Sequence, residues 1–202
     1  ITIICDAYGG AIADIAAAET AFPHRRGVLF SMQYYAQMPP SAWPEYLEQR
    51  YHKFLPDLNV ENQLYTSIMN RFASRSHDTD NYEIFDLDHA YRDGGVQGVW
   101  ELDERIKQMD REGIAAEFIH NGDFRACGLF FQSSNTDHPM ELCQAGVKGY
   151  NRWLHDTFGS EPDRLYLIGI LGAAPWRSMD ELLAELDWIA DRGFKATQVP
   201  GY

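Results

Sequence analysis

The stretch Arg111-Glu-Gly-Ile-Ala-Ala-Glu-Phe118 decides the fold class, and Asp191-Arg-Gly-Phe-Lys-Ala-Thr-Gln198 repeats its pattern. In both, a charged helix end is followed by a glycine and then by a mostly apolar segment. Glycine just after the last helical residue is a typical helix stop, and a short apolar run after it is typical of a buried strand. The recurring order of helix, glycine and strand predicts an α/β fold with a parallel sheet covered by helices.

Three helices are predicted to alternate with strands in the second half of the chain. The first has apolar residues at helical spacing over 102–109 and ends at Gly113, and the second covers 140–158. The third begins at Ser178, which forms a capping box with Glu181. Its buried side is predicted to consist of Leu182, Leu183, Leu186 and Ile189.

Four buried strands are predicted, at residues 1–5, 114–119, 165–171 and 194–199. A long insertion of about 11–98 follows the first strand, with helices expected at 41–54 (Ser41 as N-cap) and 60–74 and an irregular loop over 74–98. A closed β/α barrel needs eight strands. The pattern therefore predicts one domain, 1–202, that is either the N-terminal half of a TIM-like (β/α)8 barrel or an open α/β sheet, with regular β/α units over about 99–202.

The composition excludes several classes of partner. The formal net charge is −13, from 17 basic and 30 acidic residues, and such a surface repels both nucleic acid and anionic lipid. The longest apolar runs are far shorter than the ~20 residues that span a bilayer. The 3 cysteines are odd in number and widely spaced, which suits the reduced thiols of a cytoplasmic protein.

Three stretches of the second half together resemble the amidohydrolase-2 superfamily, which includes aminocarboxymuconate-semialdehyde decarboxylase and related metal-dependent hydrolases. They are Glu104-Arg-Ile-Lys-Gln-Met-Asp-Arg-Glu-Gly-Ile-Ala-Ala-Glu-Phe118, Gly149-Tyr-Asn-Arg-Trp-Leu-His-Asp156 with Pro162-Asp-Arg-Leu165, and Asp187-Trp-Ile-Ala-Asp-Arg-Gly-Phe-Lys195. The resemblance implies a β/α barrel that binds one divalent metal ion, zinc being the expected one.

The metal site of this family begins at the end of the first strand, where an acidic residue or histidine is followed two positions later by a histidine. Asp6 matches the first position, and Tyr8 stands where the histidine is expected. A phenol oxygen binds a metal less readily than imidazole at neutral pH. The resemblance therefore implies Asp6 and Tyr8 as metal ligands, with the family's remaining ligands on later strands beyond Tyr202.

The chemistry of a β/α barrel lies at the carboxyl ends of its strands. His120 follows the strand at 114–119 and is the predicted catalytic residue, because imidazole transfers protons near neutral pH. A structural histidine in that loop is the alternative. The predicted substrate-binding residues are Asn121, Asp123, Trp176 and Gln198, although the first two also suit the turn at Gly122.

Three functions remain open. The first is hydrolysis of a small organic substrate, such as an aromatic or cyclic one, by a metal-activated water. The second, decarboxylation, is the other outcome that the resemblance implies. The third is a non-catalytic, metal-free half-barrel, which Tyr8 and the end of the chain at Tyr202 favour. Its expected partner, in a homo- or hetero-oligomer, is the C-terminal half of the barrel or a second subunit that covers an open strand edge.

Overall fold

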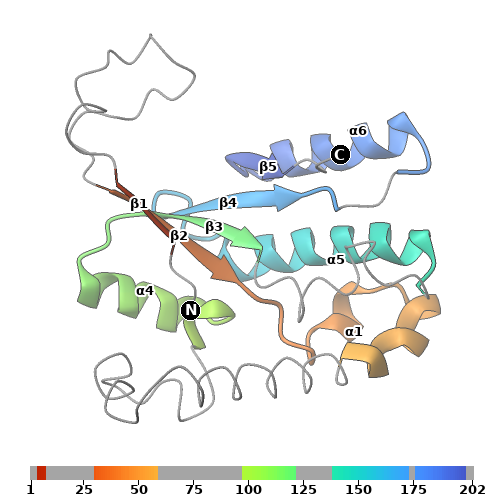
Figure 1. Cartoon of the computed structure of the whole chain (residues 1–202), viewed down its shortest axis with the longest axis horizontal. Helices are drawn as coiled ribbons and strands as arrows, with labels where there is room; N and C mark the ends of the chain where they lie inside the picture. Colours follow the sequence, from red (N-terminus) through yellow and green to blue (C-terminus); the bar gives the residue numbers. More distant parts are fainter. Residues whose placement is uncertain (1–3, 8–29, 59–96, 122–137, 173–175, 199–202) are drawn as a thin grey trace.

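The computed structural model describes residues 4–7, 30–58, 97–121, 138–172 and 176–198, which form a mixed α/β fold (Figure 1). In chain order, the elements are β1 (Ile4–Ala7), β2 (Phe30–Ala36), α1 (Trp43–Tyr46), the 3-10 helices η2 (Gln49–Phe54) and η3 (Gln97–Val99), α4 (Leu102–Glu112), β3 (Glu117–Asn121), α5 (Met140–Phe158), β4 (Leu165–Ile170), α6 (Met179–Asp191) and β5 (Ala196–Gln198). None of the helices in these ranges is long and apolar enough to cross a membrane.

The strands form one sheet in the order β1-β2-β3-β4-β5. Strands β2 to β5 run parallel to one another, which the sequence predicts for β3, β4 and β5, and β1 runs antiparallel to β2. Ala36 at the end of β2 lies opposite Asn121 at the end of β3, and Ile170 at the end of β4 lies opposite Gln198 at the end of β5. The carboxyl ends of the parallel strands therefore meet at one edge of the sheet.

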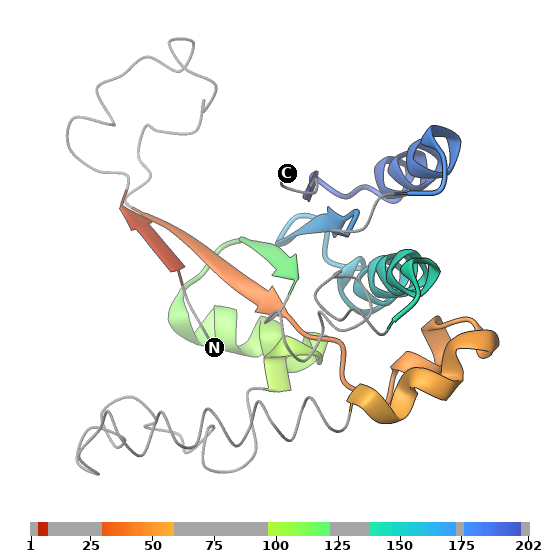
Figure 2. The same ribbon diagram turned by 45° about the vertical axis from the view of Figure 1, so that its right-hand side comes forward.

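Helices α4, α5 and α6 lie on the same side of the sheet (Figures 1 and 2). This side, here called the helix face, buries Ile119 completely, and an added Cβ at Gly169 would come within 2.9 Å of Ile189 on α6. The opposite side, here called the open face, carries Phe118, which is 41% exposed. Within the described ranges, the parallel strands therefore follow one another in sequential order with these three helices on one side.

The beginning of the sheet differs from the sequence prediction. Strand β1 extends to Ala7, so Asp6 lies within the strand and not after it, and β1 is not the first parallel strand. That position belongs to β2, in the segment where only helices and a loop are predicted. The sequence just before it, Arg25-Arg-Gly-Val-Leu-Phe30, has the same order of charged residues, glycine and apolar residues as the segments before β3 and β5, and β2 pairs with β1 on one side and β3 on the other.

The helix predicted over 41–54 is interrupted. Helix α1 begins after Ala42, not Ser41, and no side chain caps it. Leu47 is extended (φ −103°, ψ 133°), and η2 begins two residues later. Trp43, Leu47 and Tyr51 are all buried against the rest of the core, as their spacing of four residues would also allow in a continuous helix. The helix predicted over 60–74 and most of the loop over 74–98 lie outside the described residues.

The three later helices follow the sequence signals closely. Helix α4 is followed by Gly113, whose φ of 72° lies in the left-handed region that favours glycine. Helix α5 has the predicted bounds. The N–H of Glu181 donates to the hydroxyl of Ser178 at the start of α6, at 3.2 Å. These local signals position the ends of the helices without help from distant residues.

The buried side of α6 was predicted wrongly at one position. Leu183 is 47% exposed, and Glu185 is only 2% exposed. Leu182, Glu185 and Ile189 face the same way on a helix, so the carboxylate occupies the middle of the buried side. Its charge is balanced by Arg152 of α5, which forms an ion pair with it. A hydrophobicity pattern does not anticipate a buried acid whose partner lies on another helix.

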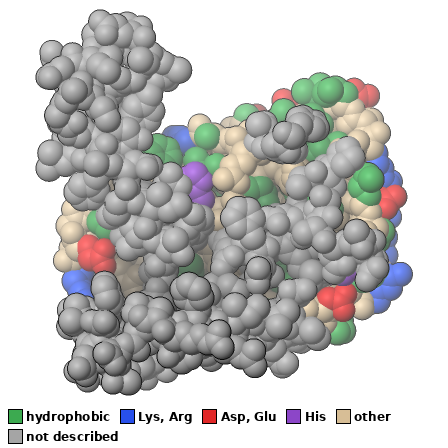
Figure 3. Space-filling model, viewed as in Figure 1, with side chains coloured by type: hydrophobic (Ala, Val, Ile, Leu, Met, Phe, Trp, Pro, Cys, Tyr) green, Lys and Arg blue, Asp and Glu red, His purple; other side chains and the backbone are tan. Residues whose placement is uncertain are grey.

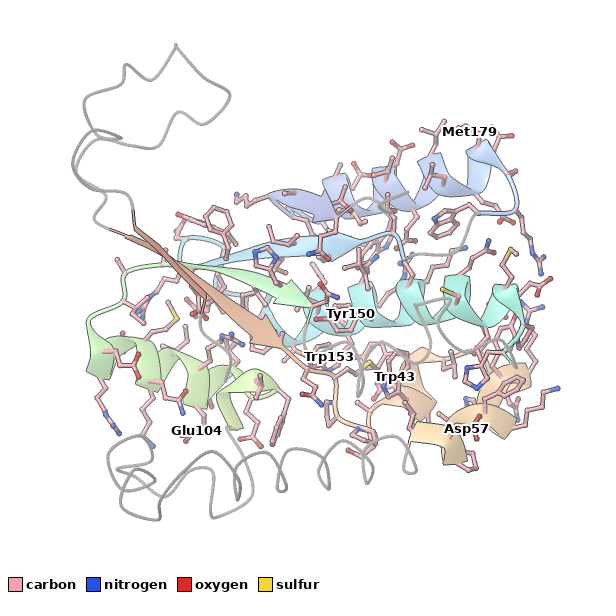
Figure 4. All side chains as sticks on the ribbon, in the orientation of Figure 1. Trp43, Asp57, Glu104, Tyr150, Trp153 and Met179 are labelled. Atoms are coloured by element: carbon pink, nitrogen blue, oxygen red, sulfur yellow. The ribbon has the colours of Figure 1, made fainter. Side chains whose placement is uncertain are left out.

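Helix α5 is anchored to the strand ends by two buried polar side chains. The hydroxyl of Tyr150 donates to the carbonyl oxygen of Ala36, at 2.8 Å. The side chain of Asn151 accepts from the N–H of Ile170 at 3.0 Å and donates to its carbonyl at 2.8 Å. Figure 4 labels Tyr150 together with Trp153 and Trp43, which pack between α5, the end of β2 and α1.

Two arginines join α4 and its following loop to the strands. Arg105 and Glu117 form an ion pair whose side chains are 5% and 2% exposed, between α4 and β3. Arg164, just before β4, donates to the carboxylate of Asp110 at 2.7 Å and to the carbonyl of Ile114 at 2.9 Å. Because these arginines bond the chain before and after Gly113, they determine how α4 returns to the sheet.

Asn151→Leu keeps a similar volume but leaves the buried N–H and C=O of Ile170 without their side-chain partners. Each unsatisfied group costs about 1–3 kcal/mol, so the free energy of unfolding in urea should fall by several kcal/mol. Asp187→Ala on the exposed side of α6 is the control, with a change within about 0.5 kcal/mol. Equal stability of the two variants would contradict the anchoring role of Asn151.

Candidate functional site

Two of the predicted site residues meet at the carboxyl edge of the sheet. The side-chain nitrogen Nε2 of Gln198 on β5 lies 3.5 Å from Nδ1 of His120 on β3. The two strands are not neighbours, because β4 runs between them. Both side chains extend from the open face and reach each other across β4. Strands two apart in a flat sheet are separated by about 9.6 Å, so curvature towards the open face favours this contact.

The end of β5 is held against β4 by hydrogen bonds. The N–H of Leu171 donates to the carbonyl of Gln198 at 3.2 Å, and the hydroxyl of Thr197 donates to the carbonyl of Gly169 at 3.2 Å. Thr197 thus faces the helix side, and Gln198 faces the open side. The backbone at Gln198 is therefore positioned by β4, and its exposed side chain is directed to His120.

Partial burial favours the neutral form of the His120 ring. Burial lowers the pKa of His120 below its ordinary value of 6.5, because a charged ring is less well solvated there. A neutral imidazole carries one protonated and one unprotonated nitrogen. It can therefore donate a hydrogen bond with one nitrogen and accept with the other, and it can transfer a proton.

An aromatic group lies beside the pair on the open face. The rings of Phe118 and Tyr166 have centroids 5.3 Å apart, and the ammonium of Lys195 lies 5.9 Å from the centre of the Tyr166 ring. Phe118 is two residues before His120 on the same strand, so the two share a face. The alternation of side chains along β3 could have indicated that Phe118 lies on the same face as His120. That Tyr166 of β4 lies next to Phe118 follows only from the strand register.

The other substrate-binding candidates lie apart from this pair. Asn121 is 8% exposed and, as the residue after His120 in β3, faces the helix side. Trp176 donates its ring N–H to the carbonyl of Leu171 at 3.0 Å, and Lys148 lies 5.5 Å from its ring centre. Trp176 thus covers the end of β4. Asp123 lies outside the described residues.

Asp6 lies towards the opposite edge of the sheet from His120. In the strand register Asp6 pairs with Ser31 near the start of β2, whereas His120 pairs with Tyr35 near its end. Ser31 and Tyr35 are four residues apart, which is about 13 Å along a strand. The antiparallel direction of β1 causes this separation, because it reverses the edge at which the strand ends.

A metal ion finds no complete set of ligands among the described residues. Catalytic zinc usually takes three protein ligands, and the ranges that the structure describes contain no group of three His, Cys, Asp or Glu side chains able to hold a metal ion. Tyr8, the second predicted ligand, lies outside these ranges. His120 and Gln198 alone do not fit a zinc centre.

The comparisons with known proteins assign no family. No protein-family model matches the chain, and no solved structure matches it. A stretch of 35 residues is 57% identical to the berberine bridge enzyme-like protein C-1 of Nicotiana tabacum. This stretch is 17% of the chain and spans 6% of the length of that protein. So short a match carries no conclusion about fold or activity.

The pKa of His120, measured by NMR titration, should lie below 6.5 because the ring is half buried. The His120 resonance is identified as the histidine signal that is absent from the spectrum of the His120→Gln variant. In the unfolded chain, His120 has a pKa of about 6.5 and therefore binds a proton more readily than it does in the folded chain. The wild type should therefore keep its full stability above pH 6.5 and lose stability relative to His120→Gln as the pH falls below it. A pKa at or above 6.5 would contradict this environment.

Proposed function

We propose that the chain is part of a singly wound β/α barrel that hydrolyses a small organic molecule at the carboxyl ends of its strands. The barrel is supported by the sequential order of β2 to β5 and by helices on one face only. Side chains from alternate strands form layers inside such a barrel. Phe118 and His120 of β3 and Gln198 of β5 have the orientation that this arrangement requires.

The observation that carries the proposal is the contact between His120 and Gln198 at this edge. Hydrolysis needs a group that takes a proton from the attacking water or supplies one to the leaving group. His120 is suited to this role, because partial burial favours the neutral form of the ring. Gln198 adds an amide that can bind a polar group of the substrate, and the rings of Phe118 and Tyr166 offer an apolar surface beside them.

The divalent metal implied by the amidohydrolase resemblance belongs to the same proposal. A bound metal would supply Lewis acidity and lower the pKa of a bound water. Its ligands would have to include residues outside the described ranges, since the described ones contain no set of three. A cytoplasmic location is part of the proposal as well and rests on the 3 widely spaced cysteines.

The direct test is hydrolysis of a panel of aromatic and cyclic esters, amides and lactones, with and without one equivalent of zinc. The substitution His120→Gln should lower kcat by about 10²–10⁴-fold, the usual contribution of a proton-transferring group. His155→Gln on α5, between the helices and away from the open face, is the matched control and should retain activity.

Two outcomes would reject hydrolysis at this site. One is equal activity of the wild type and His120→Gln. The other is release of carbon dioxide from aromatic carboxylates without any hydrolysis, which would assign the decarboxylase alternative. A zinc content near one per chain, lost together with activity on chelation, would support the metal-dependent form of the proposal.

A second candidate function is a non-catalytic half-barrel that pairs with another polypeptide. It is favoured by apolar side chains exposed on α6, Met179 at 65% and Leu183 at 47%, where hydrophobic atoms gather in Figure 3. Strand β5, beneath the same helix, is the last strand in the sheet order. A following β/α unit would cover both the strand edge and these side chains.

This alternative predicts a native mass above the 23.1 kDa of one chain. Leu183→Asp should weaken the association by placing a charge in the apolar contact, whereas Asp187→Asn, also exposed on α6, should leave it unchanged. Native mass spectrometry measures both. A chain that is monomeric at micromolar concentration would exclude pairing between copies of this chain.

A further inference from the structure

The contact between Gln198 and His120 has a direction. The atom of Gln198 nearest to the ring is the amide nitrogen Nε2, which only donates, and it faces Nδ1 of His120 at 3.5 Å. A ring nitrogen that accepts a hydrogen bond carries no proton. In a neutral imidazole the proton must then reside on the other nitrogen, Nε2.

We propose that Gln198 is a positioning residue that holds the His120 ring in the tautomer protonated at Nε2. The catalytic meaning of this assignment rests on the proposed hydrolase function, because only then does the ring act on a substrate. The tautomer itself does not depend on that function. It follows from the donor on Gln198 and from the neutral state of the ring.

The backbone of Gln198 is fixed by hydrogen bonds, which suits a residue that must position another side chain. Its carbonyl accepts from the N–H of Leu171, just after β4, and the preceding Thr197 donates to the carbonyl of Gly169 on β4. Because the backbone at the strand end is already fixed, only side-chain torsion angles must be restricted when Gln198 contacts His120. A glutamine can extend across β4 towards β3, whereas serine or threonine at the same position would be too short.

The energy required is small. A tenfold preference for one tautomer corresponds to about 1.4 kcal/mol, which one hydrogen bond can supply. Burial contributes independently, because it disfavours the doubly protonated ring in which both nitrogens would donate. Gln198 therefore needs only to select between two neutral forms that are close in energy.

The tautomer determines what His120 does for a substrate. With the proton on Nε2, the ring donates a hydrogen bond from that atom and can stabilise negative charge that develops on a carbonyl oxygen. The same tautomer does not offer Nε2 as a metal ligand, because a ligating nitrogen must be unprotonated. His120 is then a hydrogen-bond donor to the substrate through Nε2, the atom from which it would supply a proton to the leaving group in the proposed hydrolysis, and not a member of a metal centre.

The test is the ¹⁵N NMR spectrum of the His120 ring in the whole chain without substrate, since the two ring nitrogens differ in shift according to protonation. The wild type should show Nε2 protonated and Nδ1 unprotonated. In Gln198→Leu the donor is lost, and the Nδ1-protonated fraction should rise by at least about threefold. In Gln198→Glu the carboxylate can only accept, so the proton should move to Nδ1 and the pKa of His120 should rise.

The control is Ala196→Ser, which changes an exposed residue two positions earlier on the same face of β5 and should leave the tautomer unchanged. The proposal is overturned by a wild-type ring protonated at Nδ1, or by a tautomer ratio that is the same in the wild type, Gln198→Leu and Gln198→Glu. Absence of hydrolytic activity with the tautomer effects present would reject the hydrolase function and leave the positioning role intact.

Discussion

The buried side chain of Asn151 connects three elements of the fold, and the carboxyl edge of the sheet depends on it. Pairing between β3 and β4 extends to Ile119 opposite Leu167. Farther along β4, the N–H and C=O of Ile170 bond the amide of Asn151 from α5. The same amide donates to Glu185 of α6 at 2.9 Å. Because buried backbone groups require partners, this one residue satisfies the backbone at the end of β4, the strand that runs between His120 and Gln198.

The stretches on which the amidohydrolase-2 resemblance was based contain residues that hold helices and strands of the described ranges together. The first contains the Arg105–Glu117 ion pair between α4 and β3. The second contains Asn151 and Arg164, which join α5 and the start of β4 to their neighbours. These contacts hold α4, α5 and the start of β4 to their neighbours. They do not specify a reaction, because chemistry depends on the side chains at the strand ends.

The candidate site was partly predictable. A histidine and a glutamine at the ends of parallel strands were expected near the same edge, since parallel strands end on the same side. Their contact was not predictable, because it depends on the register of β4 and on the curvature of the sheet. Asn121 shows the limit of the sequence argument: one position beyond His120, it faces the helices and not the open face.

The sequence by itself determined the features that arise within a few residues. These are the end of α4 at Gly113, the cap of α6 at Ser178 and the alternation of helices with parallel strands in the second half of the chain. Only the tertiary structure decided the direction of β1, the pairing of β2 between β1 and β3, and the burial of Glu185. The physical reason is distance along the chain. A helix cap or a glycine stop acts on neighbouring residues. Strand pairs such as Gln33 with Phe118, and ion pairs such as Arg152 with Glu185, join residues that meet only on folding.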